Sequence, residues 1–207
     1  MDRDRAIAIA SEHSTELAQR LDFIYELDRL KTVLRQSMLI DDSRQENSAE
    51  HSWHLAMVAL TMAPLAAEPI DIERAVKILL VHDIVEIDAG DAFIYDDAKR
   101  AEAEAIEQEA AERIFGMLPE PEATEFRALW DEYEDRSTPE GRFAYSCDRL
   151  QPLLLNVAID GGSWRRHGVS AERVKAVNGP IEVGLPTVWP VAEAMIDQAV
   201  AEGKLEP

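Results

Sequence analysis

Two histidines and two aspartates in three separate segments of the chain could together bind one divalent metal ion. They are His51, the adjacent pair His82-Asp83, and Asp148. Imidazole nitrogens and carboxylate oxygens form mixed ligand sets for divalent metals, which activate water and polarise substrate oxygens. Asp83 follows the apolar run Leu79-Leu80-Val81, where burying an unpaired carboxylate would be costly. A cation would supply its partner, so these residues predict a metal-dependent hydrolase.

With waters completing a roughly octahedral shell, this ligand set favours Mn, Co, Fe or Mg over a closed structural zinc site. Each residue alone has an ordinary alternative. A lone histidine in a helix is more often packed or exposed than a ligand, and Asp148 could simply pair with Arg149 or Arg142. The four together favour one mononuclear site.

Two more acids follow closely and are candidate catalytic residues. Glu86 lies four residues beyond His82, so a continuing helix would place both on one face. Asp91 follows Gly90, where the chain can turn sharply and return toward the same cavity. Carboxylates there could orient or deprotonate a water, or protonate a leaving group, and the sequence does not assign these roles. The alternative for both is a solvated helix end.

The elements that must position these residues are helices. Asn47 with Glu50 has the form of a capping box, which predicts a helix over 48–64 with His51 in its first turn. Asp71 opens a helix that reaches His82-Asp83, and Thr138-Pro139 starts the helix that carries Asp148.

The remaining pattern is helical as well. Leucines and an isoleucine spaced three and four residues apart predict an amphipathic face: Leu17, Leu21, Ile24, Leu27 and Leu30. Further helices are expected over 97–117 and 122–134, after Ser170 and after Thr187, with a loop over 160–168. Strand signals are almost absent. The sequence predicts one all-α domain over 1–207, a helical bundle with its motif core at about 30–156 and C-terminal helices over 170–203.

Composition narrows the partners. The 207 residues carry a formal net charge of -20, which argues against nucleic acid as a partner, because phosphate backbones are bound by basic surfaces. No apolar run approaches the ~20 residues of a membrane helix, and no secretory signal is visible. The single cysteine, Cys147, fits a reducing compartment, so we expect a cytoplasmic protein.

The order His51, His82-Asp83, Asp148 resembles the HD-domain phosphohydrolases, which are named for their His-Asp pair. The resemblance runs from about Leu30 to Asn156. Three segments look specifically like the 5′-deoxynucleotidase branch: Glu46-Asn47-Ser48-Ala49-Glu50-His51-Ser52-Trp53, Val81-His82-Asp83-Ile84-Val85-Glu86 and Gly90-Asp91.

This resemblance implies an α-helical fold, a single divalent metal held by the four ligands, and hydrolysis of nucleoside 5′-monophosphates. The family's acidic pair falls on Glu86 and Asp91. Related deoxynucleotidases carry an arginine followed by an aromatic residue before the first metal histidine, whereas this chain has Leu34-Arg35-Gln36-Ser37 and a second arginine, Arg44. Arg35 is therefore the candidate phosphate ligand, with Arg44 as a second candidate, and the preference for deoxyribose over ribose is open.

Three alternatives are weighed. Dinuclear oxygenases share the fold but need more histidines, and none lies between Asp83 and Asp148. An HD-domain phosphodiesterase of cyclic or signalling nucleotides fits the motif spacing less well, whereas a phosphohydrolase for another phosphate ester stays open. A non-catalytic helical scaffold stabilised by metal would not need Glu86 and Asp91 beside open coordination positions.

Two expectations concern surfaces. The resemblance suggests a homodimer, for which the apolar segment 188–201 is a candidate interface, with packing inside the chain as the equal alternative. Trp53 and Trp164 could stack on a nucleobase, although core packing is the stronger expectation for Trp53.

Overall fold

Helices make up 71% of the chain. A computed structural model describes the side chains of residues 1–96 and 102–207. Besides the helices it contains a small two-stranded sheet. The predicted all-α fold class is confirmed. Among the described residues, no helix is both long and apolar enough to cross a lipid bilayer.

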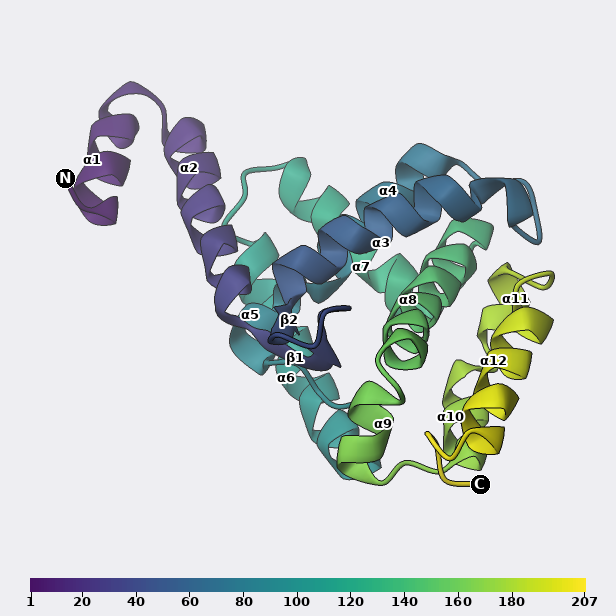
Figure 1. Cartoon of the computed structure of the whole chain (residues 1–207). Helices are drawn as coiled ribbons and strands as arrows, with labels where there is room; N and C mark the ends of the chain where they lie inside the picture. Colours follow the sequence, from purple (N-terminus) through teal and green to yellow (C-terminus); the bar gives the residue numbers. More distant parts are fainter.

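The elements follow one another from the N-terminal hairpin to the C-terminal helix (Figure 1). The α-helices are α1 (Arg3–His13), α2 (Thr15–Leu27), α3 (Ser48–Met62), α4 (Ile72–Val81), α5 (Glu86–Ala89), α6 (Asp97–Phe115), α7 (Glu122–Asp135), α8 (Pro139–Ala158), α9 (Gly162–His167), α10 (Ala171–Asn178), α11 (Ile181–Gly184) and α12 (Trp189–Ala201). The 3₁₀ helices are η1 (Asp28–Thr32), η2 (Ala63–Leu65) and η3 (His82–Val85), and the strands are β1 (Leu34–Met38) and β2 (Gln45–Asn47).

Helix α8 is the central element of the fold. It lies between the α3–α4 pair and the C-terminal helices, and it packs against α3, α4, α7, α9, α10, α11 and α12 (Figure 1). Its buried side chains include Phe143, Cys147, Leu150 and Leu153, which belong to one continuous apolar core. The position of α8 places Asp148 in the core, where it faces His51 in α3 and His82 in η3.

The predicted helix starts are confirmed. At the start of α3, the backbone N–H of Glu50 donates to Oδ1 of Asn47 at 2.9 Å, and the N–H of Asn47 donates to Oε2 of Glu50 at 3.2 Å. This reciprocal capping fixes the first turn, which carries His51. Asp71 caps α4, and Thr138 caps α8 with Pro139 in its first turn.

The helix was expected to continue past His82. Instead α4 ends at Val81, and the 3₁₀ helix η3 and then α5 follow it. The tighter turn still buries His82, Asp83 and Glu86 on the inner side of the chain. Gly90 ends α5 with a φ of 73°, a conformation that glycine adopts at little cost, and the chain turns back toward the core. Asp91 therefore returns toward the cavity, as its position after Gly90 predicts.

The hairpin β1–β2 was not predicted, because its strands are short and mostly polar. The strands pair antiparallel, with Leu34 opposite Asn47 and Met38 opposite Gln45. Burial alternates along β1, so Arg35 and Ser37 point inward while Leu34 is exposed. The hairpin thus carries the side chain of Arg35 to the core.

The prediction of a loop over 160–168 is wrong, because residues Gly162–His167 form α9. Oδ1 of Asn156 accepts hydrogen bonds from the backbone N–H and hydroxyl of Ser163, which holds the first turn. Trp164 is 1% exposed and anchors the helix in the core. Asp160 and Gly161 have positive φ values and reverse the chain before α9. Their sequence is typical of a loop, so the short helix that follows was not predicted.

Two predictions of which side chains are buried are also wrong, one for Trp53 and one for the apolar face of α2. Trp53 is 65% exposed, because α3 turns His51 and Leu55 inward and Trp53 outward. In α2 the helix is confirmed, but Leu17 and Ile24 are exposed. Helix α2 instead packs through other side chains, including Phe23, whose ring meets that of Phe126 edge-on at 5.5 Å.

Candidate active site

The four predicted metal ligands lie together in the core. One ligand atom each of His51, His82 and Asp83 lies within 4.8 Å of the other two. Oδ1 of Asp148 lies 2.8 Å from Nε2 of His51 and 3.8 Å from Nε2 of His82. All four residues are buried. Residues from α3, η3 and α8 therefore converge on one point.

Both histidines turn Nε2 toward this point. Nδ1 of His82 lies 2.8 Å from the carbonyl oxygen of Leu79, so a hydrogen on Nδ1 leaves Nε2 with a free lone pair. Nδ1 of His51 lies 3.1 Å from Oε1 of Gln151 and 3.3 Å from Oε2 of Glu46. Nε2 of His82 is buried and lies 2.9 Å from Oδ1 of Asp83, although the angle between the two groups is too poor for a hydrogen bond. A metal ion would satisfy it.

The two oxygens of Asp148 have different surroundings. Oδ1 faces the histidines, whereas Oδ2 accepts a hydrogen bond from the hydroxyl of Tyr133 at 2.7 Å and another from Nη2 of Arg149. These two contacts fix the orientation of the carboxylate. Oδ1 is therefore the oxygen available to a metal, in the way that outer partners orient metal ligands generally.

The electrostatics of the site favour a cation. Burial alone would lower the pKa of His82, but Asp83 and Asp148 raise it to about 10. Burial alone would raise the pKa of Asp83, but His82 and Arg35 hold it at about 2. Without a metal, the carboxylates therefore draw a proton onto His82. A divalent metal would supply this positive charge instead, so both the donor set and its charge fit one.

Glu86, Asp91 and Arg35 form a second group beside the ligands. Nη1 of Arg35 donates to Oδ2 of Asp83 at 2.7 Å and lies 3.6 Å from both Oε1 of Glu86 and Oδ1 of Asp91. Ser48 donates to Oε2 of Glu86 at 2.6 Å. Burial, followed by the nearby charge of Asp83, raises the pKa of Glu86 well above its usual value, against the opposing effect of Arg35. The three predicted residues thus face the same space as the ligands.

Arg44 is not part of this group. Its side chain is 52% exposed and donates to both carboxylate oxygens of Glu50, at 2.8 and 2.6 Å. The structure therefore brings Arg35, but not Arg44, to the candidate site.

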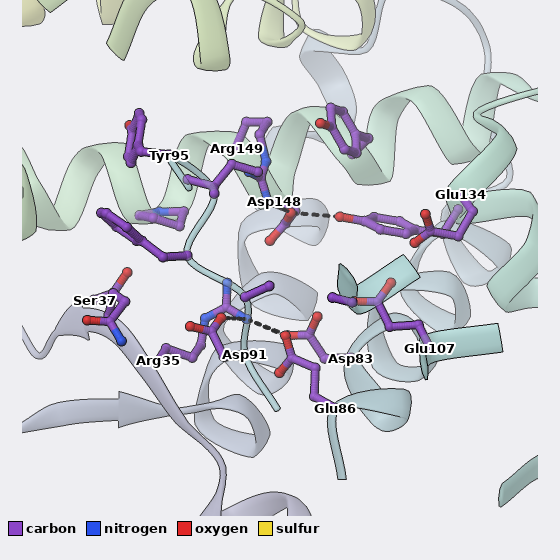
Figure 2. A pocket seen from close by; sticks show the side chains of 18 of the residues that line it. Arg35, Ser37, Asp83, Glu86, Asp91, Tyr95, Glu107, Glu134, Asp148 and Arg149 are labelled. Atoms are coloured by element: carbon purple, nitrogen blue, oxygen red, sulfur yellow. Dashed lines mark hydrogen bonds and ion pairs between the residues drawn. The ribbon is translucent and has the colours of Figure 1, made fainter. Parts of the chain in front are cut away.

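A cavity of about 460 Å³ is lined by two of the four candidate ligands, Asp83 and Asp148. Figure 2 shows Arg35, Asp83, Glu86 and Asp91 on one side of it and Asp148 and Arg149 on the other. Its walls also include polar and aromatic side chains, among them Gln36, Ser37, Phe93, Tyr95, Tyr133, Tyr145, Asn156 and Asn178, and acids including Glu104, Glu107 and Glu134. The volume falls within the range of small-molecule sites.

The segment after Asp91 forms one wall of the cavity. The hydroxyl of Tyr95 accepts hydrogen bonds from Nε1 of Trp164 at 3.1 Å and from Nδ2 of Asn178 at 3.2 Å. These bonds tie the wall to α9 and α10. The buried indole of Trp164 is thereby committed to the wall rather than available to stack on a base.

Several residues that orient the ligands were not singled out from the sequence: Glu46, Tyr133 and Gln151 for this role, and Arg149 beyond a pairing with Asp148. Glu46 and Gln151 join through a 2.9 Å hydrogen bond from Nε2 of Gln151. No spacing rule connects Glu46 in β2 or Tyr133 in α7 to the ligands, whereas Gln151 follows Asp148 by three residues in α8, a spacing that could have been used. For Arg149, its place next to Asp148 was the available signal.

Comparison with known proteins identifies the family. A model of the HD domain family matches residues 27–189. The 5′-deoxynucleotidase HDDC2 of Danio rerio is 31% identical over 135 residues, which are 65% of this chain and 66% of that protein. The human protein of the same name is 30% identical over 65% of each chain. The matches thus span just under two thirds of these relatives' length.

A solved structure is similar over nearly the whole chain. It is described as a predicted metal-dependent phosphohydrolase from Magnetospirillum magnetotacticum, and it is 48% identical with a TM-score of 0.88. The similarity covers 93% of this chain and 99% of that one. A protein from Pyrococcus furiosus, 21% identical with a TM-score of 0.60 over 87% of this chain and 99% of its own, shares the fold.

Proposed function

The chain belongs to the HD domain family, and we propose that it is a metal-dependent phosphohydrolase that converts ribo- or deoxyribonucleoside 5′-monophosphates into nucleoside and phosphate. The observation that carries the proposal is the convergence of Nε2 of His51 and of His82 on carboxylate oxygens of Asp83 and Asp148, two acids that also line a cavity. The names of the curated relatives support the choice of nucleotides as substrates.

His51, His82, Asp83 and Asp148 would hold one divalent metal ion. When bound, the ion would supply Lewis-acid chemistry at the phosphate. Two nitrogen and two carboxylate ligands beside an open cavity favour Mn, Co, Fe or Mg over zinc.

Arg35 is the proposed phosphate ligand within the cavity. Its guanidinium is nearly buried and lies beside three carboxylates, so it remains charged and fixed in place. A guanidinium can donate two parallel hydrogen bonds to phosphate oxygens. It would hold the phosphate against the ligand group and offset its charge.

Glu86 and Asp91 are the proposed proton-transfer residues. In the hydrolysis, a water oxygen forms a bond to phosphorus, the bond from phosphorus to the 5′ oxygen breaks, and that oxygen receives a proton. One carboxyl group would orient or deprotonate the water, and the other would protonate the leaving oxygen. Ser48 fixes Glu86 for either task, and the assignment between the two acids stays open.

The proposal extends to the protein as a whole. We infer that residues 1–207 form one HD-type domain that acts in the cytoplasm as a homodimer, without a nucleic-acid partner. The charge of -20 supports the lack of a nucleic-acid partner and the free, buried Cys147 supports a reducing compartment, whereas the homodimer rests on the family resemblance alone. In α12, the candidate interface, Ala192, Ile196 and Ala199 are buried within the chain, so the segment packs internally.

Phosphate release from a panel of ribo- and deoxyribonucleoside 5′-monophosphates tests the proposed function. Metal-stripped protein would be resupplied with Mn, Co, Mg or Zn. We expect metal-dependent release that Asp83→Ala abolishes. The control is Asp88→Asn, because Asp88 accepts hydrogen bonds from Arg113 outside the cavity and should not affect release. No release with any metal, from protein that binds metal at the four residues, would contradict the proposal.

A further inference from the structure

Arg149 is a second arginine beside the ligand group. It follows Asp148 in α8, its side chain is 11% exposed, and it lines the cavity. Its guanidinium lies 5.2 Å from the ring centre of Tyr145. In Figure 2, Arg149 projects from α8 on the side of the cavity opposite Arg35. Two buried guanidiniums therefore flank the space in front of the ligands.

The hydrogen bonding of Arg149 is incomplete. Nη2 donates to Oδ2 of Asp148, and within residues 1–96 and 102–207 no other hydrogen bond of its side chain is formed. Nε is buried without a partner. Burying a guanidinium is costly unless its N–H groups are satisfied. Tyr133 already holds the same oxygen of Asp148, so orienting that carboxylate does not by itself account for the arginine.

The charge of the site also calls for a second cation. Asp83, Glu86, Asp91 and Asp148, when ionised, outnumber the two arginines by two negative charges. A divalent metal would cancel this excess. A phosphomonoester carries nearly two negative charges at neutral pH. Arg149 thus reduces the negative charge that the phosphate would meet beside the metal, in a cavity whose wall carries further acids, Glu104, Glu107 and Glu134.

We propose that Arg149 binds the substrate phosphate opposite Arg35, and that the two arginines select phosphomonoester dianions over phosphodiesters. This inference rests on the proposed phosphohydrolase function. A phosphomonoester offers three terminal oxygens, enough for the metal and both guanidiniums. A phosphodiester offers two and carries one charge, so it uses the second arginine poorly. Arg149 is thus a specificity residue as well as a binding residue.

Binding of inorganic phosphate to the metal-loaded protein tests the proposal directly. Isothermal titration calorimetry would first measure Mn²⁺ affinity, then phosphate affinity at saturating Mn²⁺, in wild type, Arg149→Met and Arg149→Lys. We expect Arg149→Met to weaken phosphate binding at least about tenfold, while Mn²⁺ affinity changes by only a few fold. Arg149→Lys keeps the charge, should preserve the fold, and should recover part of the loss.

Arg136→Met is the matched control. Arg136 lines the same cavity, and its guanidinium lies 4.6 Å from the same Tyr145 ring, but it donates to a backbone carbonyl rather than to Asp148. The Arg136→Met substitution removes one positive charge from the same cavity wall and should weaken phosphate binding less than threefold. Turnover of p-nitrophenyl phosphate and bis(p-nitrophenyl) phosphate adds the specificity test. Arg149→Met should lower kcat/KM for the monoester at least tenfold more than for the diester.

The contrary outcomes are distinct. If Arg149→Met loses Mn²⁺ affinity while phosphate affinity at saturating Mn²⁺ is unchanged, Arg149 only orients Asp148 and the inference is wrong. If Arg136→Met loses as much phosphate affinity as Arg149→Met, the effect reflects only the net charge of the cavity, and the inference is also wrong. If wild type binds and hydrolyses monoesters and Arg149→Met does the same, only this inference fails. If metal-loaded wild type neither binds phosphate nor hydrolyses any monoester, the proposed function fails with it.

Discussion

Individual side chains around the candidate metal position are held by a second set of polar groups. Ser48 fixes Glu86, Tyr133 and Arg149 fix Asp148, and Gln151 contacts His51. Such contacts keep donor atoms in place before any ligand arrives. Replacing single residues should therefore separate the residues that carry out chemistry from those that orient them.

Glu86→Gln should abolish most turnover while leaving the metal site intact. Glutamine keeps the shape of the side chain and can still accept the hydrogen bond from Ser48, but it cannot exchange a proton. We expect kcat to fall by roughly 10²–10⁴-fold, with Mn²⁺ affinity within a few fold of wild type. Steady-state kinetics and calorimetry would measure both. If kcat changes by less than threefold, Glu86 takes no part in proton transfer and Asp91 must act without it.

Tyr133→Phe should weaken metal binding. The change removes only the hydroxyl that donates to Oδ2 of Asp148 at 2.7 Å, and the ring remains. Loss of an outer hydrogen bond to a metal ligand typically costs about 10–100-fold in metal affinity or activity. Calorimetry with Mn²⁺ would measure the change. Tyr145→Phe is the control, because it removes a hydroxyl from a neighbouring ring that does not bond to Asp148, and it should bind Mn²⁺ as wild type does.

At the scale of elements, the sequence predicted the main helices of the site better than the features between them. Asn47, Asp71 and Thr138 marked helix starts because capping is a local interaction. The hairpin β1–β2 was not predicted because its strands are short and mostly polar, and α9 was not predicted because Gly161 and Gly162 resemble a loop. The four candidate ligands, which the structure brings together, were proposed from acids and imidazoles in apolar helices.

Contacts between side chains on different helices and strands could not be predicted from the sequence. The contact between Tyr133 and Asp148 joins α7 to α8, and that between Arg35 and Asp83 joins β1 to η3. Neither follows from periodicity, because each depends on how two elements pack. The same holds for Leu17 and Ile24, whose spacing is helical but whose exposure depends on what α2 packs against.

Asn47→Ala should destabilise the protein and weaken metal binding together. The change removes the cap of α3, whose first turn carries His51. Loss of an N-cap costs about 0.5–2 kcal/mol of unfolding free energy. Urea denaturation and Mn²⁺ calorimetry would measure the two effects. Asp2→Ala is the control, since it removes a similar cap from the peripheral helix α1. It should leave Mn²⁺ affinity unchanged, and an equal loss in both variants would contradict a local role for the α3 cap.

At the scale of the whole molecule, an ion-pair cluster whose residues do not line the cavity joins the helices α1 and α2 to the rest of the fold. The buried carboxylate of Glu26 in α2 accepts hydrogen bonds from Arg113 in α6 at 2.7 Å and from Arg3 in α1 at 3.1 Å. Arg29 in η1 donates to it as well. One carboxylate thus joins four elements, and its ionisation affects how they pack.

Acid should weaken this connection. Burial alone would raise the pKa of Glu26, but hydrogen bonds from Arg113, Arg3 and Arg29 outweigh it and lower the pKa. A carboxyl group with a lowered pKa in the folded state stabilises that state fully above its unfolded pKa of about 4.3. That contribution is lost as the pH falls below about 4.3 and through the lower, folded value.

Glu26→Gln should therefore reduce stability most at neutral pH, and its difference from wild type should shrink as the pH falls from 6 to 3. Urea unfolding at several pH values would measure this. Glu16→Gln is the control, because Glu16 forms an exposed pair with Arg20 and should change stability by at most about 1 kcal/mol. A Glu26→Gln effect of constant size across this range would contradict the role of ionisation.

The contact between His51 and Asp148 joins residues 97 positions apart in the chain, which has a consequence for folding kinetics. Closing so long a loop is slow and is completed only when α8 docks on α3. The metal ligands would then come together after the transition state, so bound Mn²⁺ should slow unfolding and leave the refolding rate unchanged. Stopped-flow measurements with and without Mn²⁺ would show this, and faster refolding with Mn²⁺ would place the ligands together before the transition state.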